Sequence, residues 1–181
     1  VRYLVAELSA QGTASAAAAP LDLGLAIDVS GSMAGGALEA AQRAARHLCA
    51  AMAPRDRLSI VAFDTRVDVL LRGQAMDDMG RDAADRAIAA LQPRGGTALF
   101  DGWLAIAEHV ATTMAEAPDA SPRVLLLSDG HANHGLCDRG EIAVHVGALL
   151  ERGVVTSTLG VGDDYDERLL GAMAEAGGGS L

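Results

Sequence analysis

From Leu21 onward, short runs of aliphatic residues alternate with longer stretches in which apolar residues recur every three or four positions. Short aliphatic runs indicate β-strands, and recurrence at three and four positions indicates amphipathic helices. Their alternation is typical of βαβ units, which build a parallel sheet with helices on both of its faces. The pattern therefore predicts one α/β domain of the doubly wound class.

The short aliphatic runs define the predicted strands. They are residues 21–27, 58–63, 67–71, 124–127 and 154–161. The second and third runs are separated only by Asp64-Thr65-Arg66, which is too short for a parallel crossover, so this pair must form an antiparallel hairpin. We therefore expect a mostly parallel sheet with one antiparallel strand, and we assign Asp64 to the hairpin turn.

The clearest helical stripe runs through Leu99, Trp103, Ile106, Val110 and Met114. Because Trp103 and Met114 lie on this apolar stripe, we expect them in the core and not in a recognition surface.

The N-terminal residues 1–20 have a different composition. Residues 3–8 form a short apolar segment that could be an edge strand, and a tract rich in Gln, Gly, Thr, Ala and Ser follows as far as Pro20. We predict an edge strand and linker over residues 1–20 and the α/β domain over residues 21–181.

The charge balance excludes several classes of function. The chain carries 24 acidic and 14 basic residues, a net charge of −10, and all of the basic residues are Arg. Nucleic-acid binding depends on a basic surface, so we exclude it. The absence of Lys also excludes a P-loop and a Schiff-base enzyme.

No apolar stretch approaches the roughly 20 residues that a membrane span requires, and no basic and then apolar leader opens the chain. We therefore predict a soluble domain that does not insert into a membrane. Cys49 and Cys137 are too few and too scattered to form a disulfide framework. Two free thiols favour the cytoplasm slightly, and a cell-surface location stays open.

Oxygen-bearing side chains follow the first predicted strand. The strand runs into Asp28, and Ser30 and Ser32 lie on the loop that leads to the next helix. Ligands of open α/β sheets bind at the carboxyl ends of the strands. A carboxylate and two hydroxyls crowded there suggest a hard cation, Mg²⁺ before Ca²⁺, although Asp28 and Ser30 could instead cap the helix.

Two further segments strengthen the metal hypothesis. Thr97 follows two glycines directly before a helix, and Asp129 follows the strand at residues 124–127. If the two strands are neighbours, Asp28 and Asp129 emerge about 5 Å apart. Two carboxylates at that distance repel each other unless a cation lies between them.

The segment Asp28-Val29-Ser30-Gly31-Ser32, with Thr97 in Gly-Gly-Thr and Asp129 in Ser-Asp-Gly, resembles the metal-ion-dependent adhesion site (MIDAS) of von Willebrand factor type A domains. The resemblance runs from about Leu21 to the C-terminus and is strongest to the bacterial branch. It implies a Rossmann-like fold.

The resemblance also implies a function without catalysis. Ser30 and Ser32 would ligate the metal through their hydroxyls, Thr97 would join them in the ligand-bound form, and Asp28 and Asp129 would act through water. The cation would be Mg²⁺, with Mn²⁺ or Ca²⁺ as alternatives, and a protein partner would supply an Asp or Glu. A complete domain would add a last strand where the sequence reads Gly177-Gly178-Gly179-Ser180-Leu181, so we expect the native protein to continue.

The competing hypothesis is an enzyme. Asp28 could be the nucleophile of a Mg²⁺-dependent phosphohydrolase, but Ser30 stands where such enzymes carry a second Asp, and Lys is absent. A Ser-His-Asp hydrolase using Ser30 or Ser32 with His131 lacks the nucleophile-elbow pattern.

Other motifs have simpler interpretations. The spacing of His131, His134 and Cys137 could hold Zn²⁺, although a partner-facing surface loop explains it as well. The acidic run Asp163, Asp164 and Asp166 lacks the glycine and glutamate of a calcium loop, so we expect helix capping. Arg94, beside the Gly-Gly-Thr turn, is either solvated or able to steer an anionic ligand.

Overall fold

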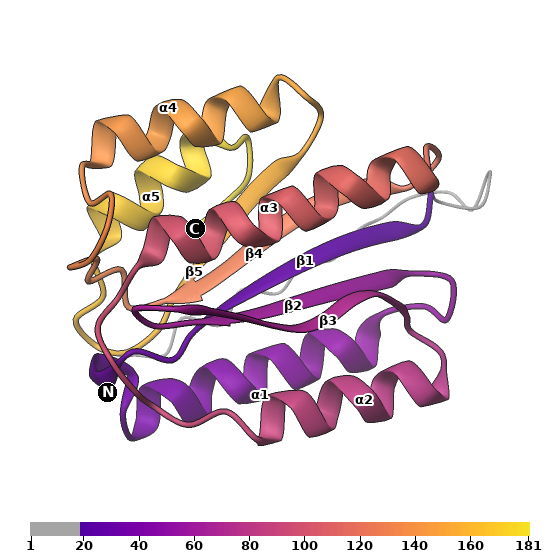
Figure 1. The fold of residues 1–181 in the computed structure, drawn as a ribbon, viewed down its shortest axis with the longest axis horizontal. Helices are drawn as coiled ribbons and strands as arrows, with labels where there is room; N and C mark the ends of the chain where they lie inside the picture. The colour runs from indigo at the N-terminus through magenta and orange to yellow at the C-terminus, as the bar shows by residue number, and fades with distance from the viewer. Residues whose placement is uncertain (1–18) are drawn as a thin grey trace.

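A five-stranded sheet lies at the centre of the protein (Figure 1), as seen in a computed structural model that describes residues 19–181. The strands are β1 (Leu21–Asp28), β2 (Arg57–Phe63), β3 (Val67–Ala75), β4 (Ser121–Ser128) and β5 (Val155–Gly160). Their order across the sheet is β3-β2-β1-β4-β5. Only β2 and β3 pair antiparallel, and the other neighbours are parallel. The predicted mixed sheet is therefore confirmed.

Helices cover both faces of this sheet. They are α1 (Gly36–Ala51), α2 (Asp78–Ala89), α3 (Leu99–Glu116), α4 (Arg139–Leu150) and α5 (Glu167–Ala176), with a short 3₁₀ helix, η1 (Gly31–Met33), after β1. In Figure 1, α1 and α2 lie below the sheet, and α3, α4 and α5 lie above it. This arrangement confirms the doubly wound class. Among residues 19–181, none of these helices is long and apolar enough to cross a membrane.

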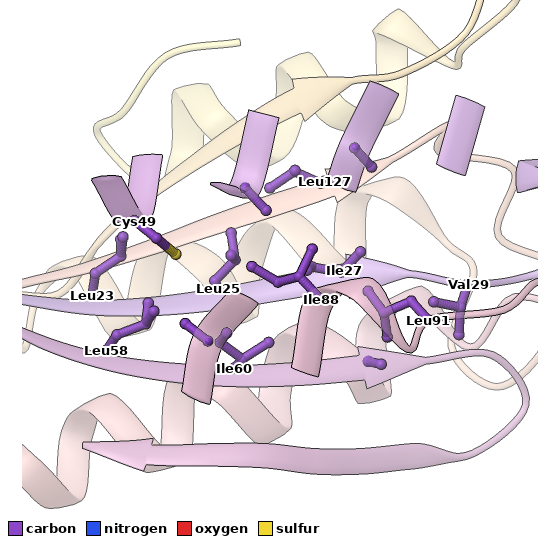
Figure 2. Packing of buried hydrophobic residues seen from close by; sticks show 14 of the residues in the cluster. Leu23, Leu25, Ile27, Val29, Cys49, Leu58, Ile60, Ile88, Leu91 and Leu127 are labelled. Carbon is purple, nitrogen blue, oxygen red and sulfur yellow. The ribbon is translucent and has the colours of Figure 1, made fainter. Parts of the chain in front are cut away.

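Alternate residues of β1 serve the two layers. Leu23, Leu25 and Ile27 pack toward α1 and α2, where they meet Leu58 and Ile60 of β2 (Figure 2). Ala26 belongs to the opposite layer. A strand that is covered on both faces in this way is expected to be apolar, as this one is between Asp22 and Asp28.

The helix α3 packs very closely against the centre of the sheet. A Cβ placed on Gly24 of β1 would lie 2.6 Å from Val110 and 2.7 Å from Ile106, so only glycine permits this approach. Trp103 is buried in the same layer and donates a hydrogen bond from Nε1 to Thr156 Oγ1 at 3.2 Å. Met114 packs against this cluster, so both residues belong to the core as predicted.

The hairpin between β2 and β3 closes as expected. The N–H group of Asp64 donates to the Arg66 carbonyl at 2.9 Å, and the Arg66 N–H donates to Asp64 Oδ1 at 2.8 Å. However, β3 continues to Ala75, beyond the predicted end at residue 71. An edge strand can pair through its backbone while its side chains are polar, so the apolar pattern stops before the strand does.

The last residues lie along the free edge of β5. The N–H of Thr156 donates to the Gly177 carbonyl at 3.0 Å, and the N–H of Thr158 donates to the Ser180 carbonyl at 2.9 Å. The bridge between Thr156 and Gly178 is parallel. This is the place where the sequence predicts a last strand. The predicted edge strand at residues 3–8 lies outside the described residues, and the domain limits stay a prediction.

Candidate metal centre

The carboxyl ends of β1 and β4 lie side by side and bring the predicted aspartates to one edge of the sheet. Ile27 pairs with Leu127, so Ser128, and not Asp129, stands beside Asp28. The two strands are neighbours as expected, and the two aspartates are offset by one residue at their ends. Asp129 still lies close enough for its charge to contribute to the raised pKa of Asp28.

The carboxylate of Asp28 forms the floor of the site. It is completely buried, and its Oδ1 accepts the N–H of Ser30 at 2.8 Å while its Oδ2 accepts the hydroxyl of Ser128 at 2.6 Å. Burial raises the pKa of Asp28 above its ordinary value, the hydrogen bonds from Ser128 and Ser30 oppose this shift, and the charge of Asp129 adds to it. Both oxygens are thus held in fixed positions.

Two serine hydroxyls follow Asp28 in the chain. Ser30 Oγ and Ser32 Oγ are 3.0 Å apart; Ser30 is buried and Ser32 is exposed. The loop that carries them is bound to the loop before α3, because the N–H of Gly31 donates to the Gly95 carbonyl at 3.0 Å and the N–H of Arg94 donates to the Val29 carbonyl at 2.7 Å. The pair of hydroxyls therefore has a fixed position relative to the loop of Thr97.

Thr97 is fixed by hydrogen bonds of its backbone, while its hydroxyl is unpaired. Its N–H donates to Asn133 Oδ1 at 2.9 Å, and its carbonyl accepts the N–H of Asn133 at 3.1 Å. The side chain is buried, yet Oγ1 finds no hydrogen-bond partner within residues 19–181. An unpaired buried polar group costs about 1–3 kcal/mol. A ligand that binds to this oxygen would remove that cost.

Asp64 also binds to both ends of the Thr97 loop, in addition to its role in the hairpin turn. Its carboxylate pairs with Arg94 Nε at 3.2 Å, and its carbonyl accepts the N–H of Ala98 at 2.7 Å. Gly95 has a φ of +62°, and a Cβ there would lie 2.6 Å from Asp64 Oδ2, so this turn requires glycine.

Arg94 is engaged within the domain. Its guanidinium pairs with Asp68 as well as with Asp64, and these carboxylates raise the pKa of Arg94, the hydrogen bond that Arg94 donates to Asp68 most of all. The possibility that Arg94 steers an anionic ligand therefore finds no support, because its charge is already balanced.

Asp129 directly follows the end of β4. It is nearly buried, and its Oδ1 accepts the N–H of His131 at 3.0 Å. Its carbonyl accepts the N–H of Asp166 at 2.7 Å, which ties the end of β4 to the loop before α5. Asp166 in turn caps α5 by accepting the N–H groups of Arg168 and Leu169, both at 3.0 Å. The predicted capping role is thus confirmed for Asp166.

The donor set fits a hard divalent cation. The candidate residues offer hydroxyl and carboxylate oxygens, and Mg²⁺ and Mn²⁺ prefer such ligands. In contrast, the part of the chain that the structure describes contains no group of three His, Cys, Asp or Glu residues able to hold a metal. The zinc hypothesis for His131, His134 and Cys137 is therefore not supported. His131 Nε2 instead lies 2.7 Å from the Asp164 carbonyl oxygen, within hydrogen-bond distance.

Two residues of this site are not identified by sequence alone. Ser128 stands in the Ser-Asp-Gly segment, and its position at the strand end beside Asp28 is the signal that indicates the hydrogen bond. Asn133 carried no sequence signal, because its contact with Thr97 spans 36 residues and depends on the fold.

Comparisons with known proteins add independent findings. The family model of the von Willebrand factor type A domain matches residues 23–131. An uncharacterized protein of Synechocystis sp. is 36% identical over 169 residues, which cover 90% of this chain. The chain spans only 37% of that relative's length.

Solved structures share the fold. The von Willebrand factor type A protein of Catenulispora acidiphila superposes with a TM-score of 0.74 at 22% identity, over 90% of this chain and 39% of the other. The manganese-loaded TRAP protein of Plasmodium vivax gives a TM-score of 0.69 at 21% identity, over 87% of this chain and 63% of the other.

Proposed function

The chain belongs to the von Willebrand factor type A domain family, and from this premise we propose that it is a metal-dependent protein-binding module. Domains of this family are commonly metal-dependent adhesion modules. In our proposal, Asp28, Ser30, Ser32, Thr97 and Asp129 form a complete MIDAS. The cation is Mg²⁺, with Mn²⁺ or Ca²⁺ as alternatives, and the partner supplies an Asp or Glu side chain.

The observation that carries the proposal is the hydroxyl of Thr97. It is buried and unpaired within residues 19–181, on a loop bound to the loop of Ser30. Ser30, Ser32 and Thr97 would ligate the cation through neutral hydroxyl oxygens, and Asp28 and Asp129 would hold it through water. The bound cation would supply a positive charge able to accept an external carboxylate oxygen.

The charge of the site favours an acidic partner. Neutral hydroxyl ligands leave the charge of a divalent cation only partly balanced, so a carboxylate from outside is attracted to it. Ser32 is exposed, so a cation bound to its hydroxyl would be accessible to a partner. An acidic chain of net charge −10 can therefore offer an anion-binding face at the carboxyl edge of its sheet.

The alternative phosphohydrolase needs Asp28 as a nucleophile. Asp28 is completely buried and both of its oxygens accept hydrogen bonds, which lowers its reactivity as a nucleophile. We therefore rank binding above catalysis. Turnover of p-nitrophenyl phosphate by the purified protein, lost in Asp28→Asn, would reverse this ranking.

The proposal is tested with the simplest carboxylate. Amide chemical shifts of Gly31 and Thr97 are followed by NMR while acetate is added in the presence of Mg²⁺, with acetamide as a neutral ligand of matched shape. We expect acetate alone to move these signals, and we expect EDTA or Ser30→Ala to abolish the effect. Ser121→Ala, at the opposite end of β4, serves as the matched control. Equal shifts from acetamide, or a response that survives in EDTA, would refute metal-dependent binding.

A further inference from the structure

A pocket of about 500 Å³ adjoins the candidate metal centre. It lies beyond the end of β4, and Gly130 and Asn133 form part of its lining. Gly130 directly follows Asp129 in the chain, and Asn133 accepts the N–H of Thr97 at 2.9 Å. The pocket and the candidate metal centre therefore share a wall, so one bound segment can reach both.

Two arginines give this pocket a positive character. Arg139 is the first residue of α4, and Arg168 lies in the first turn of α5; both line the pocket and are exposed. Neither takes part in a salt bridge within residues 19–181, whereas Arg46, Arg57 and Arg94 each pair with a carboxylate.

Carboxylates also lie close to the two arginines in the chain. The acidic residue in the lining is Asp166, and its Oδ1 is already engaged as the cap of α5. The N-termini of α4 and α5 are already capped by Asp138 and Asp166, and each first turn also carries a glutamate, Glu141 or Glu167. An anion in the pocket would therefore bind through the two guanidinium groups.

We propose that this pocket binds a second acidic side chain of the partner, so that the partner presents two acidic residues on one short segment. The inference rests on the proposed function, in which the first carboxylate binds at the metal. Arg139 and Arg168 would hold the second carboxylate, because guanidinium groups form paired, charge-assisted hydrogen bonds with carboxylates. An extended segment advances about 3.3 Å per residue, so a short spacing joins two adjoining sites.

The test uses synthetic Gly/Ser peptides that carry either one Glu or two Glu residues at successive spacings, titrated against the protein in Mg²⁺. We expect one spacing to bind about 10-fold more tightly than the single-Glu peptide, as an added charge-assisted contact should give. The double variant Arg139→Gln/Arg168→Gln should remove this gain and leave the affinity for the single-Glu peptide unchanged. Arg123→Gln, an exposed arginine in β4 outside the pocket, should keep the gain.

The outcomes separate the two proposals. If no spacing binds more tightly, or if the gain persists in the double variant, the pocket proposal is overturned while Mg²⁺-dependent binding of the single-Glu peptide stands. If neither peptide shows Mg²⁺-dependent binding, the proposed function fails, and the second-subsite proposal fails with it. Circular dichroism of each variant establishes that the fold is intact.

Discussion

Two aspartates of β1, Asp22 and Asp28, lie near opposite ends of the same strand and are both completely buried. Burial raises the pKa of both carboxyl groups. Their partners differ, however. Both oxygens of Asp28 accept hydrogen bonds, whereas Oδ2 of Asp22 accepts the Thr113 hydroxyl and its Oδ1 has no partner within residues 19–181.

The difference shows that a buried carboxylate is not in itself a binding site. At the carboxyl end, Ser30 and Ser128 donate hydrogen bonds to Asp28 from separate segments. The Thr97 hydroxyl, on a loop bound to the Ser30 loop, has no partner within residues 19–181. At the amino end, Asp22 has the Thr113 hydroxyl and a more distant attraction to Arg57. We therefore assign metal binding to one end and a cost in stability to the other.

The largest expected effect separates the two aspartates by metal affinity. Asp28→Ala should weaken Mg²⁺ binding by about 100-fold, since outer-sphere groups of metal sites contribute at this scale. Asp22→Ala should leave Mg²⁺ affinity unchanged. Isothermal titration of both variants measures the contrast. A similar loss in the two would show that the comparison has no functional meaning.

A smaller effect is expected from the hydroxyls that contact the two carboxylates. Ser128→Ala removes the hydrogen bond to Asp28 Oδ2 and should lower Mg²⁺ affinity by about 10-fold, because the carboxylate loses its fixed orientation. Thr113→Ala removes the hydrogen bond to Asp22 and should lower the free energy of unfolding without changing Mg²⁺ affinity. Unchanged Mg²⁺ binding in Ser128→Ala would count against the proposed role of Ser128.

The smallest effect concerns the pH dependence of stability. Because the folded-state pKa of Asp22 is raised above 3.8, the folded protein binds this proton more tightly than the unfolded chain does. The charged carboxylate therefore destabilises the fold above the folded-state pKa, and this cost disappears as the pH falls through that pKa toward 3.8.

The variant Asp22→Asn removes this ionisation. It should raise the free energy of unfolding at pH 7 by about 1 kcal/mol and flatten the acidic part of the stability profile, as measured by urea unfolding. Asp119→Asn, at an exposed position, is the matched control and should change stability by less than about 0.5 kcal/mol. A less stable Asp22→Asn protein would show that the charged form of Asp22 is favourable.

The architecture was predictable from the sequence because its causes are local. Aliphatic runs marked the buried strands, and the short Asp64-Thr65-Arg66 connection required the antiparallel pair. The end of β3 could not be predicted, since Arg72 and Gln74 continue an edge strand without an apolar pattern.

The candidate site was predictable only in its list of residues. The predicted strand ends identified Asp28 and Asp129 as candidates. The register that places Ser128 beside Asp28, however, is set by the pairing of the two strands. The contact from Asn133 to Thr97 and the support of the loop by Asp64 likewise join segments distant in sequence. Such contacts depend on tertiary structure, which composition and periodicity do not encode.

The central claim is that the carboxyl edge of β1 and β4 binds a divalent cation through hydroxyl oxygens. The most direct test is a crystal soaked in Mn²⁺, with the ion located by its anomalous scattering. The account predicts one Mn²⁺ ligated by Ser30 Oγ and Ser32 Oγ, and by Thr97 Oγ1 when a carboxylate is bound, with Asp28 and Asp129 joined to it through water. Mn²⁺ bound only elsewhere, for example at Asp163 and Asp164, with no ion at the serine hydroxyls, would contradict the account.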